Sequence, residues 1–329
     1  MKSEYIKYLV CPKCGSDLEF KEIKKEISGR IESGLIVCSK CSAAYEIIKF
    51  IPRFVPKENY ASSFGLEWNI HSKTQYDSYS GINCSEKRFF EETGWPRNLK
   101  GQIILEAGSG SGRFTEQAAS TDALVISADY SNAVESNYKS NGNRDNVFIV
   151  QADIYSLPFR KQSFDKLLCI GVIQHTPDPY KTFMSLPQFL KAGGKLTVDI
   201  YKKNYSIYFT IKFYIRPFTR KMDAGKLYNW TKKYVDFMWP IAGIIRRIPK
   251  IGTKINWALC VADYSQLGLK GQMLKEWAYL DTFDMLSPRY DYPQTIKTVK
   301  KWLQDAGLSD IDVRYGYNGI EARGTKQLE

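Results

Sequence analysis

The chain has 329 residues, 43% of them hydrophobic and 25% charged, a composition typical of a soluble globular protein and a length that suits two domains. It excludes long disorder, collagen-like repeats and a protein with many membrane spans, since no run approaches the ~20 apolar residues of a spanning helix. Lys2, Glu4 and Lys7 stand where a signal peptide would be apolar, so we expect the protein in the cytoplasm.

The net charge of +12 is concentrated in one segment. Residues 201–260 hold thirteen Lys or Arg against two acids, which is +11 and leaves the rest of the chain almost neutral. The same segment holds thirteen of the 46 aromatic residues. We therefore expect it to contact an anionic partner or to cover something apolar.

Two Cys-x-x-Cys pairs in residues 1–56 indicate a metal module. Cys11 and Cys14 are followed, after 23 residues, by Cys38 and Cys41. This spacing predicts a four-cysteine zinc ribbon, whose Zn²⁺ is structural because four thiolates leave no open position. So small a module would need the metal for its stability. We interpret the remaining cysteines as ordinary reduced thiols: Cys84, Cys169 and Cys260.

Residues 57–100 have a helical pattern and should form a linker or cap. Aromatic and polar residues recur there every three or four positions, as Phe64, Trp68, His71, Gln75 and Tyr79 do. Such a stripe is more often a packing face than a binding face. We name Trp68 and Gln75, together with Tyr201, as candidate substrate contacts.

Strand-like runs alternate with helical segments from residue 101 onward. The runs cover 102–106, 123–128, 147–150, 164–170 and 195–200, which predicts a Rossmann-like α/β fold, a parallel sheet with helices on both faces. Residues 101–200 and 286–329 would form this domain, because the pattern resumes with a helix over 295–306 and two short strands. Residues 201–285 interrupt it as a helical insertion.

The start of this insertion predicts an amphipathic helix. Its two faces carry different residues: Ile207, Tyr208, Ile211, Tyr214, Ile215 and Phe218 on one, and Lys212, Arg216 and Arg220 on the other. An apolar stripe of this kind normally packs on the helix's own domain. We therefore expect the insertion to be a lid whose basic side chains point outward.

A glycine-rich turn, from Glu106 to Gly112, directly follows the first strand of the sheet domain. Small residues let the backbone approach a ligand, and the next helix can present its amide end to it. The spacing is not the G-x-G-x-x-G of dinucleotide-binding proteins, and no Walker lysine follows. Acids end the next two strands: Asp129 could bind ribose hydroxyls and Asp153 an adenine amino group. The alternative for Asp129 is a turn or helix cap before Ser131.

These motifs, with the runs 163–179 and 190–196, resemble the class I S-adenosylmethionine-dependent methyltransferases of the type 11 group, closely over residues 100–200. The resemblance implies S-adenosylmethionine as the cofactor, with its methionine near Glu106, its ribose on Asp129 and its adenine between Asp153 and Ile154. The remaining implied cofactor contacts are Gly108, Ser109, Gly110, Gly112, Tyr130 and Ile170.

By the same resemblance, His175 lies beside the reacting methyl group and is the candidate catalytic residue. Its ordinary pKa near ~6.5 suits a general base; the alternative is that it shapes its loop while catalysis works by proximity. Gln174 replaces an acid often found there, which puts any carboxylate role at that position in doubt.

The whole chain also resembles bacterial methyltransferases of the surface-polysaccharide and natural-product type, and this resemblance implies methyl transfer to an O or N atom of a small-molecule or glycan-type acceptor. An alternative is an RNA methyltransferase, because a ribosomal RNA methyltransferase group also joins a four-cysteine ribbon to this fold. Another is a lipid-linked acceptor reached by peripheral contact with a membrane. A non-enzymatic zinc-ribbon protein would not need Glu106, Asp129 and Asp153 together. The sequence does not indicate the oligomeric state.

Overall fold

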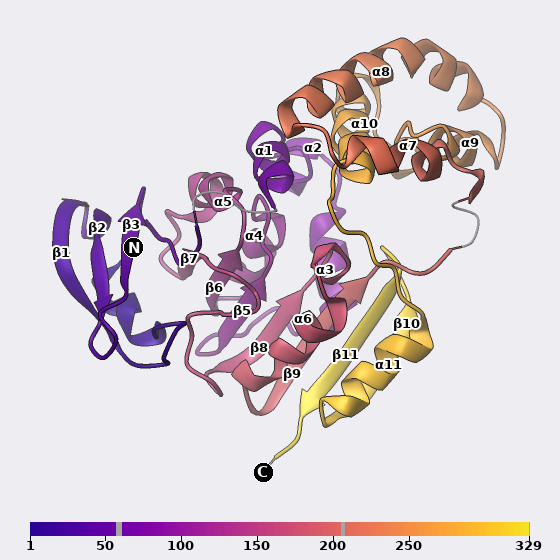
Figure 1. The fold of residues 1–329 in the computed structure, drawn as a ribbon. Helices are drawn as coiled ribbons and strands as arrows, with labels where there is room; N and C mark the ends of the chain where they lie inside the picture. The colour runs from indigo at the N-terminus through magenta and orange to yellow at the C-terminus, as the bar shows by residue number, and fades with distance from the viewer. Residues whose placement is uncertain (57–60, 205–207, 329) are drawn as a thin grey trace.

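A computed structural model describes residues 1–56, 61–204 and 208–328. A seven-stranded sheet of order β10-β11-β9-β8-β5-β6-β7 forms its centre (Figure 1). The strands are β5 (Ile103–Ala107), β6 (Leu124–Asp129), β7 (Val147–Gln151), β8 (Phe164–Cys169), β9 (Leu190–Ile200), β10 (Leu308–Tyr315) and β11 (Ile320–Lys326). The Rossmann-like α/β class is confirmed. The sheet is mixed, however, since β11 runs antiparallel to both β9 and β10.

The central strands are almost continuously apolar because helices cover both faces of the sheet. One hydrophobic cluster joins alternate strand residues to α6 (Pro179–Ser185) and α11 (Ile296–Asp305); the other joins the intervening residues to α3 (Ser85–Thr93), α4 (Arg113–Ala119) and α5 (Val134–Asn141). Short 3-10 turns are η2 (Ile173–His175) and η3 (Pro187–Phe189). Thr295 caps α11 through Thr298 N–H, as expected where the helical pattern resumes.

The strand order reverses between β5 and β8, which both pair with parallel neighbours. At such a point, the loops after the two adjacent strands run in opposite directions. A crevice therefore opens between them at the carboxyl ends of the strands. The bounds predicted from the sequence for β5, β6, β7 and β8 agree with those in the structure to within one or two residues.

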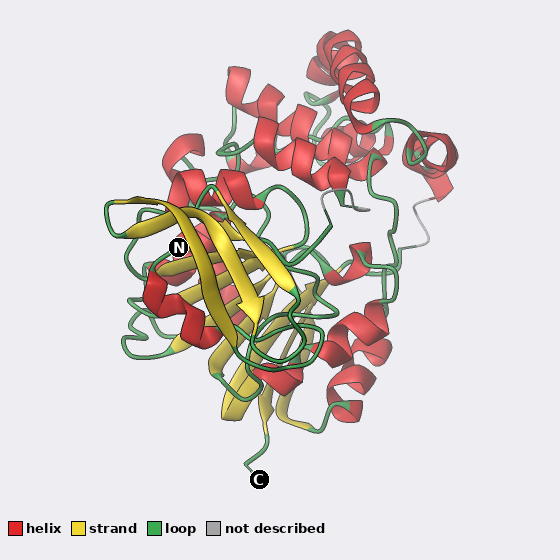
Figure 2. Cartoon of the chain, turned by 60° about the vertical axis from the view of Figure 1, so that its left-hand side comes forward, coloured by secondary structure: helices red, strands yellow, loops and turns green. Residues whose placement is uncertain are grey.

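The N-terminal part is an antiparallel sheet of β1 (Leu18–Ile27), β2 (Arg30–Cys38), β3 (Ala44–Ile48) and β4 (Ile51–Pro52), preceded by η1 (Ser3–Tyr8). It lies at the β7 edge of the main sheet (Figures 1 and 2). The Tyr5 ring stacks on Phe148 of β7 at 4.9 Å, and Arg53 bridges to Gln151. One hydrophobic cluster runs through both parts, so the N-terminal sheet does not rely on a core of its own.

Two further groups of helices come from separate parts of the chain. α1 (Ser62–Ile70) and α2 (Asp77–Ser80) lie under the insertion, which consists of α7 (Ile211–Thr219), α8 (Ala224–Ile245), α9 (Gly252–Ala258), η5 (Ser265–Leu267) and α10 (Gly271–Leu286). His71, after α1, and Tyr228 of α8 are within hydrogen-bond distance, Nε2 to hydroxyl at 2.9 Å. Within the described ranges, no helix has both the length and the hydrophobicity to cross a bilayer.

The outward orientation predicted for the basic residues of the first inserted helix is correct for Arg220, which is exposed, and wrong for the other two. Lys212 and Arg216 point inward, where both pair with the buried carboxylate of Asp291, at 2.9 Å for Lys212. Tyr214 and Phe218 are instead 64% and 75% exposed. The position of this helix is therefore set by the ion pairs with Asp291, about 75 residues away in the chain, more than by its apolar stripe. Ile207, part of the expected apolar face, lies outside the described residues.

Candidate active site

A cavity of about 560 Å³ opens where the strand order reverses, at the carboxyl ends of β5, β6 and β8. Eleven residues that we expected at the site line it: Trp68, Gln75, Gly108, Ser109, Gly110, Asp129, Tyr130, Ile154, Ile170, His175 and Tyr201. Three other expected residues, Glu106, Gly112 and Asp153, do not line it. The cavity therefore collects most, though not all, of the residues that the sequence singled out.

The glycine loop forms the cavity floor in a conformation that needs glycine. Gly108 has φ +88°, and a Cβ there would lie 2.2 Å from Val172. Gly112 has φ +93°, and its Cβ would lie 2.1 Å from Asn137 Oδ1. Asp129 holds the loop from the next strand, since its Oδ2 accepts a 2.8 Å hydrogen bond from Gly110 N–H. The loop is thus fixed in shape without any ligand.

Glu106 supports this loop from below and lies outside the cavity. It is 2% exposed, and its Oε2 accepts hydrogen bonds from the hydroxyls of Thr115 and Ser127. Asn137 donates to both hydroxyls, so the buried carboxylate is part of a connected polar network. Burial raises the pKa of Glu106 to about 7, although the two hydroxyls favour its charged form.

Asp129 has two roles in the structure. It lines the cavity, as the ribose assignment requires, and its Oδ1 also accepts from the N–H and hydroxyl of Ser131, at 2.8 and 2.7 Å. The turn that we kept as an alternative therefore exists alongside the cavity position. Burial raises the pKa of Asp129. Asp153 makes a similar turn, because its Oδ1 accepts from Tyr155 N–H at 3.0 Å.

His175 lies in the cavity wall between two aromatic rings. Its ring is 5.2 Å from that of Tyr201 and 5.3 Å from that of Phe64. Nδ1 is 3.0 Å from the carbonyl oxygen of Tyr290. A carbonyl can only accept, so Nδ1 carries the proton and Nε2 of the neutral ring is left as the basic nitrogen. This geometry permits both the catalytic and the loop-shaping role.

The far end of the cavity contains acids that the sequence reasoning missed. Asp281 and Asp284 of α10 line it with Tyr264 and Trp257. Burial and the neighbouring Asp284 raise the pKa of Asp281 to about 7. Gln75 connects this end to the loop: its Oε1 accepts from Arg113 at 2.6 Å and its Nε2 lies 3.4 Å from Asp281 Oδ1. The i, i+3 spacing of the two acids on one helix was the available signal.

A buried ion-pair network holds the β9 side of the cavity. Arg88, which lines the cavity, pairs with Glu92 at 2.6 Å and with Asp199 of β9. Asp199 also accepts from Gly171 N–H. The carboxylates raise the pKa of Arg88 against the effect of burial, so this guanidinium is a fixed positive charge. Sequence reasoning missed the network because Asp199, which joins the Arg88–Glu92 pair of α3 to β9, lies more than 100 residues away in the chain.

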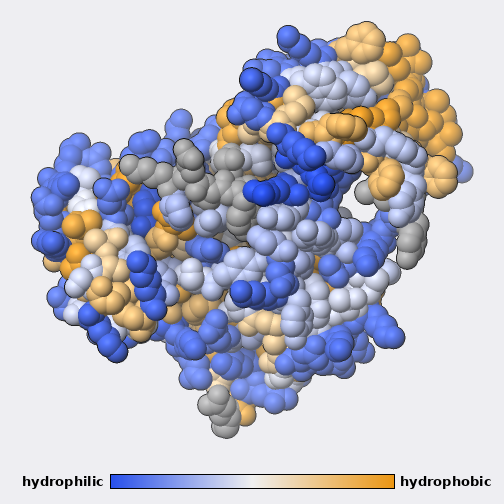
Figure 3. All heavy atoms as spheres, viewed as in Figure 1, coloured by the Kyte–Doolittle hydropathy of each residue, from blue (hydrophilic) through white to orange (hydrophobic). Residues whose placement is uncertain are grey.

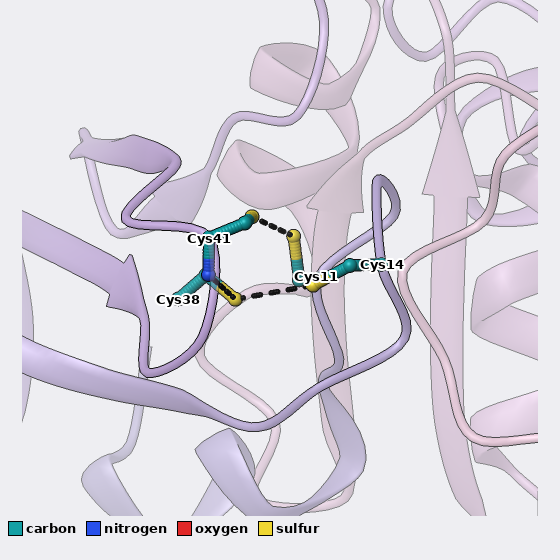
Figure 4. Close-up of side chains that lie close together, drawn as sticks. All are labelled: Cys11, Cys14, Cys38 and Cys41. Atoms are coloured by element: carbon teal, nitrogen blue, oxygen red, sulfur yellow. Dashed lines mark hydrogen bonds between the residues drawn. The ribbon is translucent and has the colours of Figure 1, made fainter.

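The four cysteines of the N-terminal sheet converge (Figure 4). Their Sγ atoms all lie within 4.8 Å of one another, with Cys11 to Cys41 at 3.6 Å and Cys14 to Cys38 at 3.4 Å. Thiolates bound to one Zn²⁺ are roughly 3.8 Å apart, given Zn–S bonds of ~2.3 Å. The amides of Lys40 and Cys41 both point at Cys38 Sγ, at 3.4 Å. The donor set and its spacing fit a tetrahedral zinc site.

Comparison with known proteins identifies a catalytic-domain family in the middle of the chain. Residues 105–198 match a family model described as a methyltransferase domain. The ubiquinone biosynthesis O-methyltransferase of Coxiella burnetii is 30% identical over 112 residues, 33% of this chain and 48% of that protein. Phosphoethanolamine N-methyltransferase 2 of Caenorhabditis elegans is 31% identical over 153 residues, 40% of this chain and 34% of that protein. This chain thus spans about half the length of the first of these relatives.

Longer matches carry less information about function. An uncharacterized protein of Synechococcus is 26% identical over 288 residues, 83% of this chain and 59% of that protein. The SAM-dependent methyltransferase of Aquifex aeolicus is similar in structure with a TM-score of 0.43 and 13% identity, over 79% of this chain and 97% of that one. One from Methanosarcina mazei has a TM-score of 0.40 and 14% identity, over 71% and 95%.

Proposed function

We propose that this protein is an S-adenosylmethionine-dependent methyltransferase that acts on an O or N atom of a small-molecule or glycan-type acceptor. One observation carries the proposal: a single cavity reaches from the glycine loop and Asp129 to Asp281 and Asp284 of the insertion. Its volume of about 560 Å³ lies in the ~300–1,000 Å³ range of small-molecule sites. The family match over residues 105–198 and the names of the O- and N-methyltransferase relatives support it.

The cofactor would supply an electrophilic methyl group on a sulfonium; the protein's part is to orient and to accept a proton. Asp129 offers a carboxylate to the ribose, and the glycine loop lets the backbone approach the methionine part. An O or N acceptor loses a proton as the new bond forms. His175 Nε2 and the Asp281 carboxylate are the candidate proton acceptors in the cavity wall, and the pKa of Asp281 suits neutral pH.

The inserted helices would keep water out of this reaction. Trp257, Tyr264 and Trp277 line the cavity from the insertion, and Trp68 lines it from α1. Methyl transfer gains most from holding the acceptor in line with the methyl group, and a dry aromatic wall favours this arrangement. A small acceptor fits an aromatic-lined cavity of this size better than a phosphate-rich chain would.

Cofactor binding provides the test. Calorimetry with S-adenosylhomocysteine should show that Asp129→Ala weakens binding about tenfold or more, since a buried hydrogen bond to a charged group contributes roughly 1.5 to 3 kcal/mol. His175→Ala should leave affinity within about twofold, because it faces the acceptor. Equal losses in the two variants, or no binding by the unmodified protein, would remove the basis of the assignment.

We also propose a structural Zn²⁺ on Cys11, Cys14, Cys38 and Cys41. The supporting observation is the convergence of their Sγ atoms within 4.8 Å. Four cysteines leave no position for substrate, so the ion would hold the two loops together and take no part in methyl transfer.

A further inference from the structure

The second half of the insertion's long helix exposes an apolar stripe. Helix α8 buries Leu227, Thr231, Val235 and Ala242 against the protein. A second row faces solvent at spacings of three, four or seven: Trp230, Phe237, Ile241, Ile244 and, just after the helix, Ile248. Phe237 is 72% and Ile244 69% exposed. We call these five residues the outer stripe. Figure 3 shows hydrophobic atoms gathered over this part of the insertion.

Basic side chains flank the outer stripe. Lys233 lies one helical turn from Trp230 and from Phe237 of the stripe. Arg247 precedes Ile248, and Lys250 and Lys254 come after the stripe in the chain. All four are exposed, and among the described residues none of them forms an ion pair. The acids nearby are used elsewhere: Asp223 caps α8, and Asp236 pairs with Lys275 at 2.6 Å. The surface around the stripe is therefore positive without internal compensation.

We propose that the outer stripe and its basic flanks dock on an anionic lipid bilayer. Aromatic and branched aliphatic side chains would enter the headgroup region while Lys and Arg reach the lipid phosphates, which is how interfacial helices bind. Phe237 and Ile244 are the most exposed residues of the row, and the basic side chains beside it match the charge of an acidic membrane. A phosphate track on RNA would need the cations but not the apolar row.

Docking would place the acceptor end of the cavity near the membrane. α9 carries both exposed Lys254 and cavity-lining Trp257, and α7 carries both exposed Phe218 and cavity-lining Lys212. Each of these two short helices therefore has one side in the cavity wall and another in solvent. Resting on the proposed function, this arrangement assigns a membrane-anchored acceptor, of which only the polar end enters the cavity.

Vesicle co-sedimentation tests the docking without any methyl transfer. We expect binding to phosphatidylcholine vesicles that contain about one third phosphatidylglycerol, and much weaker binding to phosphatidylcholine alone. Phe237→Ser with Ile244→Ser should lower binding at least tenfold. Lys233→Gln and Arg247→Gln should each lower it roughly fivefold and reduce its salt dependence. The matched control is Ile23→Ser with Ile27→Ser, two exposed residues of β1, which should leave binding unchanged.

Circular dichroism and S-adenosylhomocysteine affinity should be the same in all these variants, so that a failure of docking is distinct from a failure of the cofactor assignment. Absence of vesicle binding by the unmodified protein would overturn the proposal. It would also be overturned if light scattering showed self-association that the Phe237 and Ile244 changes abolish, since the stripe would then join two copies. RNA retention that depends on Lys233 and Arg247 but not on Phe237 would equally replace it.

Discussion

Replacing Arg216 and Arg220 by alanine, one at a time, should have very different effects on stability. Both lie on or next to α7, four residues apart. The Arg216 side chain is 14% exposed, pairs with Asp291 and donates to the Pro288 carbonyl at 2.7 Å. Arg220 is exposed, and no ion pair to it is found among the described residues. The pair therefore compares a half-buried, ion-paired arginine with an exposed one near the end of the same helix.

The expected cost of Arg216→Ala is about 2 kcal/mol, because a hydrogen bond between charged groups contributes roughly 1.5 to 3 kcal/mol and Lys212 remains on Asp291. Arg220→Ala should change the free energy of unfolding by less than about 0.5 kcal/mol. Asp291→Ala should cost about 3 kcal/mol, since it leaves two poorly exposed cations without a counter-charge. Urea unfolding followed by circular dichroism measures all three. Equal effects of the two arginine changes would mean that α7 faces the other way.

The glycine loop, a cavity acid and the cysteine cluster give three more expected outcomes. Gly112→Ala should cost more than about 2 kcal/mol in urea unfolding because its Cβ would collide with Asn137, whereas Gly81→Ala, with a similar φ but open space, should cost about 1 kcal/mol. Because the pKa of Asp281 is about 7 in the folded protein and lower in the unfolded chain, the folded protein loses stability as pH rises from about 4 to about 7. Asp281→Asn should thus be more stable than the unmodified protein at pH 7.5. This difference should vanish toward pH 4. Elemental analysis should find one zinc per chain, and well-folded protein with almost none would end the zinc proposal.

The strands and the loop at the cavity could be predicted because local sequence determines them. Each central strand is a short apolar run, and at β6 the run ends in Asp129, which marks the carboxyl end where ligands bind. Gly108 and Gly112 could also be predicted, because the glycine-rich run directly follows the first strand. Their φ values in the structure are ones that other residues rarely adopt. These features need no knowledge of which segments meet.

What could not be predicted depends on distant partners. The helical wheel could not show that Asp291 would attract Lys212 and Arg216 inward, so that they share the less exposed side of α7 with Ile211 and Ile215. The family resemblance placed Glu106 near the methionine of the cofactor, whereas in the structure its carboxylate accepts from the hydroxyls of Thr115 and Ser127 and does not line the cavity. In both cases the deciding contact is between side chains that the sequence does not bring together.

The position of β11 has a consequence for the order in which the nascent chain can fold. β11 lies between β9 and β10, so β10 has no place in the sheet until Ile320–Lys326 has left the ribosome. Until then β9 would be an open sheet edge, able to pair with another chain. Tyr317 and Asn318, in the turn before β11, also line the cavity. The cavity wall therefore becomes complete only after this turn has been synthesised, and ribosome-bound chains that stop before Tyr317 should lack this part of the site.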